Sequence, residues 1–221
     1  MSQFIVQVAN LSHLHFAETI CNEMQESAKA RGTGIAKRSP DYIQQKMLEG
    51  KSIIALSKNG QWAGFCYIET WSHGEYVANS GLIVSPEFRQ SGLAKKIKEE
   101  AFKLSRKKYP NAKLFGLTTG IAVMKINSEL GYIPVPYSEL TKDEAFWKGC
   151  ESCINFQILQ SKEKKNCLCT AMLYNPNEKR RWFDFKAKKK ILERLIKIKQ
   201  STFLKLKPKT TKNEKENIIS L

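Results

Sequence analysis

The chain has 221 residues, and 37 Lys and Arg against 21 Asp and Glu give it a formal net charge of +16. This length supports one globular domain with an extension rather than two full domains. The charge is uneven, because from Glu178 onward 15 Lys and Arg stand against 5 Asp and Glu. The basic pI is therefore a property of the C-terminal end and indicates little about an active site.

Targeting signals and membrane-spanning segments are not evident in the sequence. No apolar run approaches the ~20 residues that a transmembrane helix needs. The N-terminal stretch Met1–Val8 lacks the basic region and cleavage site of a signal peptide. Without an export signal, the six cysteines are interpreted as reduced thiols or metal ligands rather than as a disulfide framework. We therefore expect a cytoplasmic protein without membrane association.

The first half of the chain predicts two helices and an antiparallel meander. Alternating apolar residues over Phe4–Val8 predict a strand, and Ser12 is expected to cap a helix that runs to about Ala30. Ser39-Pro40-Asp41 is expected to begin a second helix, which ends at Gly50. Three strands are expected after it, at 52–57, 62–71 and 76–84, with turns at Asn59-Gly60 and His73-Gly74 between them.

The second half predicts alternating helices and strands. The expected elements are a helix from Leu93 to Leu104, a strand at 114–118, a helix over 121–130 closed by Gly131, and a strand beginning at 132–135. Taken together with the first half, this order predicts a mixed α/β fold. Its central sheet is mostly antiparallel and is flanked by helices.

The stretch between the strand that ends at Val84 and the helix that begins at Leu93 predicts an anion site. Gly92 provides backbone freedom in the turn, and a helix start presents free N–H groups at the positive end of its dipole. Several consecutive amides of this kind suit a pyrophosphate. The residues expected to bind it are Arg89, Gln90, Ser91, Gly92, Leu93, Ala94 and Lys95.

The same loop resembles the acyl-CoA loop of the GNAT N-acetyltransferases. Their pattern Arg/Gln-x-x-Gly-x-Gly/Ala is matched by Arg89 to Ala94, and the usual Val-x-Pro precedes it at Val84 and Pro86. The predicted order of elements also agrees with that family. The resemblance implies that the chain binds an acyl-CoA, acetyl-CoA or a relative such as succinyl-CoA. It also implies that a backbone N–H at Ile83 or Val84 binds the thioester carbonyl.

Three further stretches resemble the short, single-domain N-acetylglutamate synthases within that family. They are Gly34–Ser39 followed by Tyr42, then Leu114–Thr119, and then Trp147–Cys153 followed by Thr170-Ala171-Met172. The implied reaction is acyl transfer to the α-amino group of an amino acid, glutamate, in arginine biosynthesis. The substrate's carboxylates are expected to be bound by Arg38, with Thr118, Thr119 and Lys125 as further candidates.

The catalytic groups depart from the family's pattern. Asn127 occupies the position at which GNAT enzymes often carry a tyrosine acid, and asparagine cannot protonate a thiolate. The expected carboxylate of the fourth strand is missing at 78–80, so Glu69, Glu75 and His73 are the nearby candidates for the base. Two alternatives remain open: a protein or peptide N-acetyltransferase whose basic tail binds an acidic partner, and a non-catalytic acyl-CoA sensor.

The C-terminal third carries most of the cysteines and most of the charge. Cys150, Cys153, Cys167 and Cys169 could hold Zn²⁺, although buried thiols are the favoured interpretation. We expect an acyltransferase domain at 1–177 with a cysteine-containing insertion at 139–174, a basic amphipathic helix at 178–204 and a disordered tail at 205–221. The expected partner is a small-molecule amino acid rather than nucleic acid, and the apolar stripe of the basic helix leaves a homodimer open.

Overall fold

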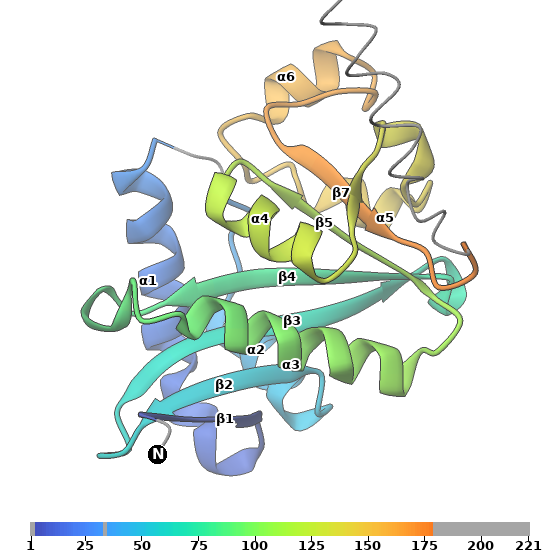
Figure 1. Cartoon of the computed structure of the whole chain (residues 1–221). Helices are drawn as coiled ribbons and strands as arrows, with labels where there is room; N and C mark the ends of the chain where they lie inside the picture. The colour runs from blue at the N-terminus through green and yellow to red at the C-terminus, as the bar shows by residue number, and fades with distance from the viewer. Residues whose placement is uncertain (1–2, 33–34, 179–221) are drawn as a thin grey trace, which may run out of the picture. The chain divides into compact units, whose positions relative to one another are not determined.

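A seven-stranded sheet forms the centre of the computed structural model, which describes residues 3–32 and 35–178 (Figure 1). Its order is β1-β2-β3-β4-β5-β7-β6, and the β4–β5 pair is parallel while the other pairs are antiparallel. The strands are β1 (Phe4–Val8), β2 (Ser52–Ser57), β3 (Trp62–Trp71), β4 (Tyr76–Val84), β5 (Lys113–Thr118), β6 (Ile133–Pro134) and β7 (Thr170–Tyr174). The predicted mostly antiparallel α/β fold is confirmed.

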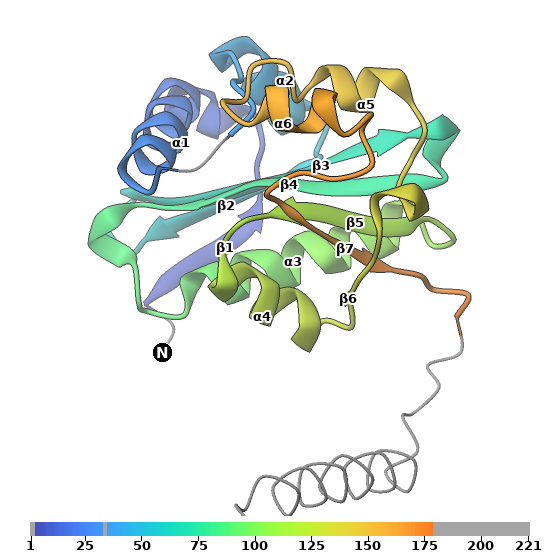
Figure 2. The ribbon, with the colours of Figure 1, turned by 90° about the horizontal axis from the view of Figure 1, so that it is seen from above.

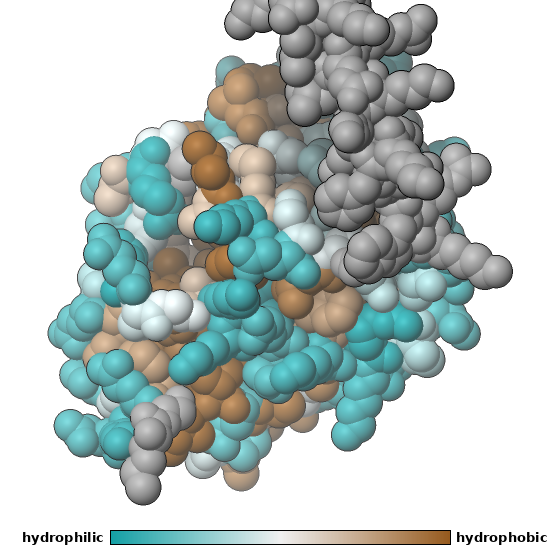
Figure 3. Space-filling model, viewed as in Figure 1, coloured by the Kyte–Doolittle hydropathy of each residue, from teal (hydrophilic) through white to brown (hydrophobic). Residues whose placement is uncertain are grey.

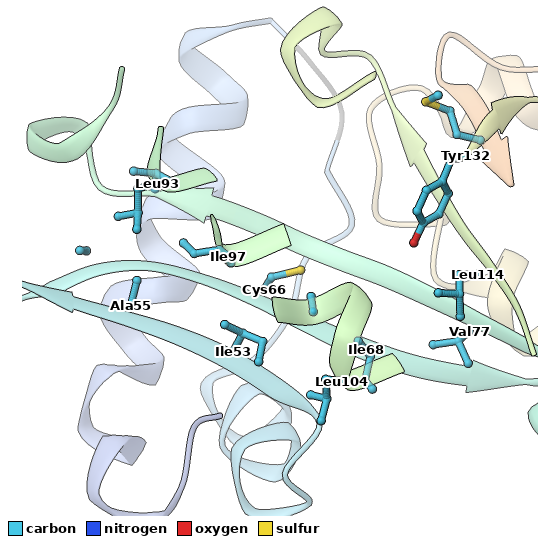
Figure 4. Packing of buried hydrophobic residues seen from close by; sticks show 14 of the residues in the cluster. Ile53, Ala55, Cys66, Ile68, Val77, Leu93, Ile97, Leu104, Leu114 and Tyr132 are labelled. Atoms are coloured by element: carbon cyan, nitrogen blue, oxygen red, sulfur yellow. The ribbon is translucent and has the colours of Figure 1, made fainter. Parts of the chain in front are cut away.

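Helices cover both faces of the sheet, as Figure 2 shows from above. One face carries α1 (Ala17–Ala30), α2 (Pro40–Leu48), α5 (Glu144–Lys148) and α6 (Phe156–Ser161), and the other carries α3 (Leu93–Lys108) and α4 (Ile121–Glu129). Because side chains alternate along a strand, Phe65 and Tyr67 of β3 pack in the core under α1 and α2. Cys66 and Ile68 pack in the core under α3 (Figure 4). The outer surface of α3 is mainly hydrophilic (Figure 3).

The first helix does not begin at Ser12 as predicted. Leu11–Phe16 forms a 3₁₀ turn before α1, and its cap is Asn10, whose side chain accepts the Ser12 N–H at 3.0 Å. The His13 ring returns the contact by accepting the Asn10 N–H at 3.1 Å. This reciprocal cap satisfies two N–H groups at once, and it therefore outcompetes a simple serine cap two residues later.

The segment predicted as an insertion, 139–174, contains the closing strand of the sheet. α5 and α6 occupy its first part, and β7 ends it by pairing with both β5 and β6. The inserted part is thus shorter than predicted. Trp147 of α5 and Leu159 of α6 pack with Phe115 of β5 and Leu173 of β7 in a third apolar cluster, so the segment is an integral part of the domain.

β4 and β5 pair over three positions, from Tyr76–Lys113 to Ala78–Phe115, and then diverge (Figure 1). Beyond that point β4 also shifts its register against β3, and Gly81 adopts φ +64° there. A Cβ on Gly81 would lie 2.6 Å from Tyr67 Cε1, so the close approach also requires glycine. The end of β4 therefore has one edge that β5 leaves unpaired.

None of the helices in the described ranges is both long and apolar enough to cross a membrane. The predicted basic helix at 178–204, apart from Glu178, and the tail at 205–221 lie outside the described residues. The division of the chain at residue 177 therefore stays a prediction.

Candidate functional site

The loop between β4 and α3 has the backbone geometry of an anion site. Gln90 and Gly92 both adopt positive φ, +64° and +77°, and Gly92 is the N-cap of α3 without a side-chain cap. A Cβ on Gly92 would meet nothing within 4 Å, so the approach to the helix start is open. The first-turn N–H groups of α3 are therefore available to an anion.

The two cations of the loop are already engaged by protein groups. The Arg89 guanidinium donates from Nε to the Val84 carbonyl at 3.2 Å and pairs from Nη2 with Glu23 of α1 at 2.7 Å. The Lys95 ammonium pairs with Glu129 of α4 at 2.8 Å. Arg89 thus fixes the loop against β4 and α1, and backbone amides are the groups left for a ligand.

The unpaired edge of β4 presents one of the two predicted carbonyl-binding amides. Ser85 donates its N–H to Ala63 of β3 at 3.0 Å, whereas the Val84 carbonyl faces away from β3 and accepts from Arg89. Because the N–H and C=O of one strand residue point to the same edge and successive residues alternate, the Val84 N–H faces the open edge. By the same alternation, the Ile83 N–H faces β3.

A pocket of about 340 Å³ lies on the opposite face of the sheet, where α2, α5 and the end of β3 meet. Its lining comprises Lys37, Arg38, Ser39, Tyr42, Glu69, Trp71, Ala145 and Gly149. The start of α2 is fixed there by Ser39, whose hydroxyl accepts the Tyr42 N–H at 3.2 Å. The volume is in the range of small-molecule sites.

Opposite charges are held side by side in this pocket. Arg38 donates from Nε to the Tyr67 hydroxyl at 3.0 Å, and its guanidinium lies 5.2 Å from the centre of the Tyr42 ring. Glu69 accepts a hydrogen bond from the Tyr42 hydroxyl and pairs with Lys46 at 3.2 Å. Burial raises the pKa of Tyr42, so this phenol remains a donor at neutral pH. Glu69 is therefore oriented from two sides.

Arg38 and Glu69 are the predicted site residues that the structure brings together. Glu75 is exposed and lies 3.7 Å from Lys113, outside the pocket. Asn127 is 1% exposed, and its amide lies 3.6 Å from the Met172 sulfur, so its side chain belongs to the core rather than to a reaction site.

The remaining acceptor candidates, Thr118, Thr119 and Lys125, are not part of the pocket's lining. The Thr118 hydroxyl accepts the Gly120 N–H at 3.0 Å and so shapes the turn after β5. Sequence reasoning missed Lys46 and Trp71. Trp71 could have been predicted, because side chains at every second position of a strand lie on the same face. Trp71 therefore shares its face of β3 with Tyr67 and Glu69.

The four C-terminal cysteines lie in one region beside the pocket. The Ser152 hydroxyl accepts the Lys37 N–H at 2.9 Å, which ties the Cys150–Cys153 turn to the pocket wall. Burial, together with the neighbouring thiols, raises the pKa of Cys150 to about 11 and of Cys169 to about 12. Within the ranges that the structure describes, no group of three or more His, Cys, Asp or Glu side chains is placed to hold a metal ion. This arrangement does not support the alternative of a zinc site.

Solved structures provide the comparison at the level of the fold. N-acetylglutamate synthase from Neisseria gonorrhoeae, complexed with coenzyme A and N-acetyl-glutamate, aligns with a TM-score of 0.57 at 15% identity, over 80% of this chain and 36% of that one. This chain thus spans about a third of that protein's length. Rv2747 from Mycobacterium tuberculosis, in complex with CoA and a ligand designated NLQ, aligns with a TM-score of 0.56 at 14% identity over 77% and 98% of the two chains.

A third solved structure has a similar fold. YncA from Salmonella typhimurium, a putative acetyltransferase with its cofactor acetyl-CoA, aligns with a TM-score of 0.54 at 14% identity, over 80% of this chain and 96% of that one. No curated protein matches the chain. Residues 21–122, which include the loop and the unpaired edge of β4, match the model of the acetyltransferase (GNAT) family. The chain therefore carries a GNAT acetyltransferase domain.

Proposed function

We propose that the protein transfers an acetyl or succinyl group from acyl-CoA to the α-amino group of a small amino acid, with glutamate as the first candidate. The observation that carries this proposal is the pocket in which Arg38 stands beside an oriented Glu69. An amino acid needs a cation for its carboxylate and an acceptor for its amine proton. The N-acetyl-glutamate bound by the Neisseria structure supports the same acceptor class.

The donor is held by backbone groups. The pyrophosphate of CoA binds the free N–H groups at the start of α3, where no side chain caps the helix. The thioester carbonyl accepts the Val84 N–H at the unpaired edge of β4. This contact is stronger in the tetrahedral intermediate, because negative charge develops on that oxygen.

The acceptor enters from the other face of the sheet. Arg38 binds a substrate carboxylate bidentately, with Lys37 beside it. Glu69 accepts the proton of the substrate's ammonium group, and the neutral amine then attacks the thioester carbon. The C–N bond forms, the C–S bond breaks, and the products are the N-acyl amino acid and CoA. Cytoplasmic location, arginine biosynthesis and a homodimer belong to the same proposal.

The test is thiol release by the purified protein with acetyl-CoA and with succinyl-CoA against the twenty amino acids. We expect release with glutamate, and the faster donor identifies the acyl group. Hydrogen bonds to charged groups contribute about 1.5–3 kcal/mol, so Arg38→Ala is expected to raise the glutamate KM by roughly 10- to 100-fold.

The matched control for this variant is Arg106→Ala. It removes a guanidinium that also lies over a tyrosine ring, 5.6 Å from the centre of Tyr174, but outside the pocket. An unchanged glutamate KM in Arg38→Ala would refute the acceptor assignment. Tight CoA binding without release from any amino acid would favour a peptide acceptor or a sensor instead.

A further inference from the structure

Lys98 is a lysine buried in the middle of α3. It is 2% exposed, whereas most lysines of α3 lie on the hydrophilic outer surface of the helix (Figure 3). In the part of the chain that the structure describes, its ammonium group has neither a hydrogen-bond acceptor nor a carboxylate partner. Its neighbours of polar character are the Tyr132 ring, whose centre lies 5.4 Å from Nζ, and the Cys66 thiol. A buried cation without an anion is costly, so the site is one that an anionic group would complete.

The helix places Lys98 opposite the unpaired edge of β4. Ser105, two helical turns later on the same face, accepts a hydrogen bond from Asn79 at 2.9 Å. Asn79 is the first β4 residue beyond the pairing with β5. Seven residues of helix span ~10 Å, and so do three residues of strand. Lys98 therefore lies near the bulged stretch around Gly81, between the start of α3 and the point where the strands diverge.

The neighbours from the other elements agree with this position. Cys66 of β3 lies 3.4 Å from the Ser80 carbonyl of β4, and it is close enough to Lys98 to act on it electrostatically. Tyr132 follows α4 and donates its hydroxyl to Asn79 at 2.9 Å. Figure 4 shows Cys66 and Tyr132 pointing into the same core. Lys98 thus lies beside the 79–80 stretch of β4, near the point where β4 and β5 diverge.

The charge state of this region follows from its burial. Burial lowers the pKa of Lys98 to about 8, so most of the ammonium form persists at pH 7. The titratable groups that face it are Cys66, whose pKa burial raises to about 11, and Tyr132, whose pKa burial also raises. Both are neutral at pH 7 and neither supplies a counter-charge. An anionic group brought to this place would therefore be the first negative charge that faces Lys98 among the described residues.

Building on the proposed acyl transfer, we propose that Lys98 is the acid that stabilises and protonates the CoA thiolate as it leaves. When the tetrahedral intermediate collapses, the C–S bond breaks and its electron pair remains on sulfur. A proton moves from the Lys98 ammonium to that sulfur, and the neutral lysine regains a proton from solvent. Lys98 thereby performs the step that Asn127, an amide in the core, cannot.

The first measurement uses CoA alone and needs no turnover. The ultraviolet absorbance of the thiolate is followed against pH for CoA bound to the full chain and for free CoA. We expect bound CoA to ionise at lower pH than free CoA, and Lys98→Met to abolish that shift. Lys103→Met removes an exposed lysine of α3 and is expected to retain it. A thiolate titration that is the same in Lys98→Met and in the unmodified protein would overturn the proposal.

Kinetics provide the second readout. General acids contribute about 10²–10⁴-fold, and thiolate is a fair leaving group, so Lys98→Met is expected to lower kcat by about 100-fold with little change in either KM. The kcat of the unmodified protein should fall as pH rises past about 8, because the ammonium form is lost there. Lys98→Arg keeps the charge but does not titrate in this range, so its kcat should not show that fall. A persistent fall in Lys98→Arg refutes the assignment even if Lys98→Met does not fold.

The two proposals fail in different ways. If no amino acid is acylated while the bound thiolate still depends on Lys98, the acyl-acceptor proposal fails and the Lys98 contact stands. If Lys98→Met acylates glutamate at the same rate as the unmodified protein, the Lys98 proposal fails and the acyl-acceptor proposal stands.

Discussion

Glu69 owes its position to two neighbours on α2, the hydroxyl of Tyr42 and the ammonium of Lys46 at 3.2 Å. The exchange Glu69→Gln preserves the shape of the side chain but removes its charge. We expect kcat to fall by about 100-fold or more, because the amine proton loses its acceptor. Steady-state thiol release at saturating glutamate measures this.

The control for Glu69→Gln is Glu75→Gln. Glu75 was an equal candidate by sequence, but it is exposed and 3.7 Å from Lys113, a surface pair of about 0–1 kcal/mol. The kcat of Glu75→Gln is therefore expected to equal that of the unmodified protein. If Glu75→Gln is slow and Glu69→Gln is not, the base has been assigned to the wrong residue.

Single residues were predictable from the sequence to different degrees. Arg38 and Glu69 could be singled out, because charged residues of these types suit the chemistry. Their joint placement could not be predicted, because it depends on how α2 packs against β3, and no local pattern encodes that contact. Lys98 could not be recognised either, because lysines are mostly exposed and one within a basic helix is expected to be so too. Only the packing of α3 against the sheet shows which face of the helix is buried.

At the scale of elements, local turn chemistry determined which predictions held. The bounds of β3 and β4, Trp62–Trp71 and Tyr76–Val84, match the predicted strands because Asn59-Gly60 and His73-Gly74 form the turns that precede them. The closing strand β7 was placed inside an insertion, because its partners β5 and β6 lie about 40 to 60 residues earlier in the chain. Long-range pairing of this kind leaves no periodic signal.

The bulge of β4 gives a stability prediction at the same scale. Gly81→Ala adds the strain of a side chain at φ +64° and places Cβ 2.6 Å from Tyr67 Cε1. Left-handed strain of about 1–2 kcal/mol and overpacking of about 1–3 kcal/mol add up to an expected loss of roughly 2–5 kcal/mol in the free energy of unfolding. Urea denaturation followed by fluorescence measures it.

Gly74→Ala separates these two causes. Gly74 also adopts positive φ, +89°, but a Cβ there meets nothing within 4 Å. Only the strain of about 1–2 kcal/mol is therefore expected. Equal losses in Gly74→Ala and Gly81→Ala would contradict the close packing of the bulge against Tyr67.

For the whole molecule, a ligand that binds only the folded state raises the free energy of unfolding. CoA at 100 times its Kd contributes about 2.7 kcal/mol, which for a domain of 150–250 residues raises Tm by roughly 5–10 °C. Ser91→Glu places a carboxylate at the open start of α3 and should remove most of this rise by repelling the pyrophosphate. The Ser91 hydroxyl donates to the carbonyl three residues before it, at 2.6 Å, and Ser161 makes the same contact at 2.9 Å far from the loop. Ser161→Glu therefore reproduces the lost hydrogen bond and the added charge, and it should keep the full rise; a full rise in Ser91→Glu as well would mean that CoA does not bind at this loop.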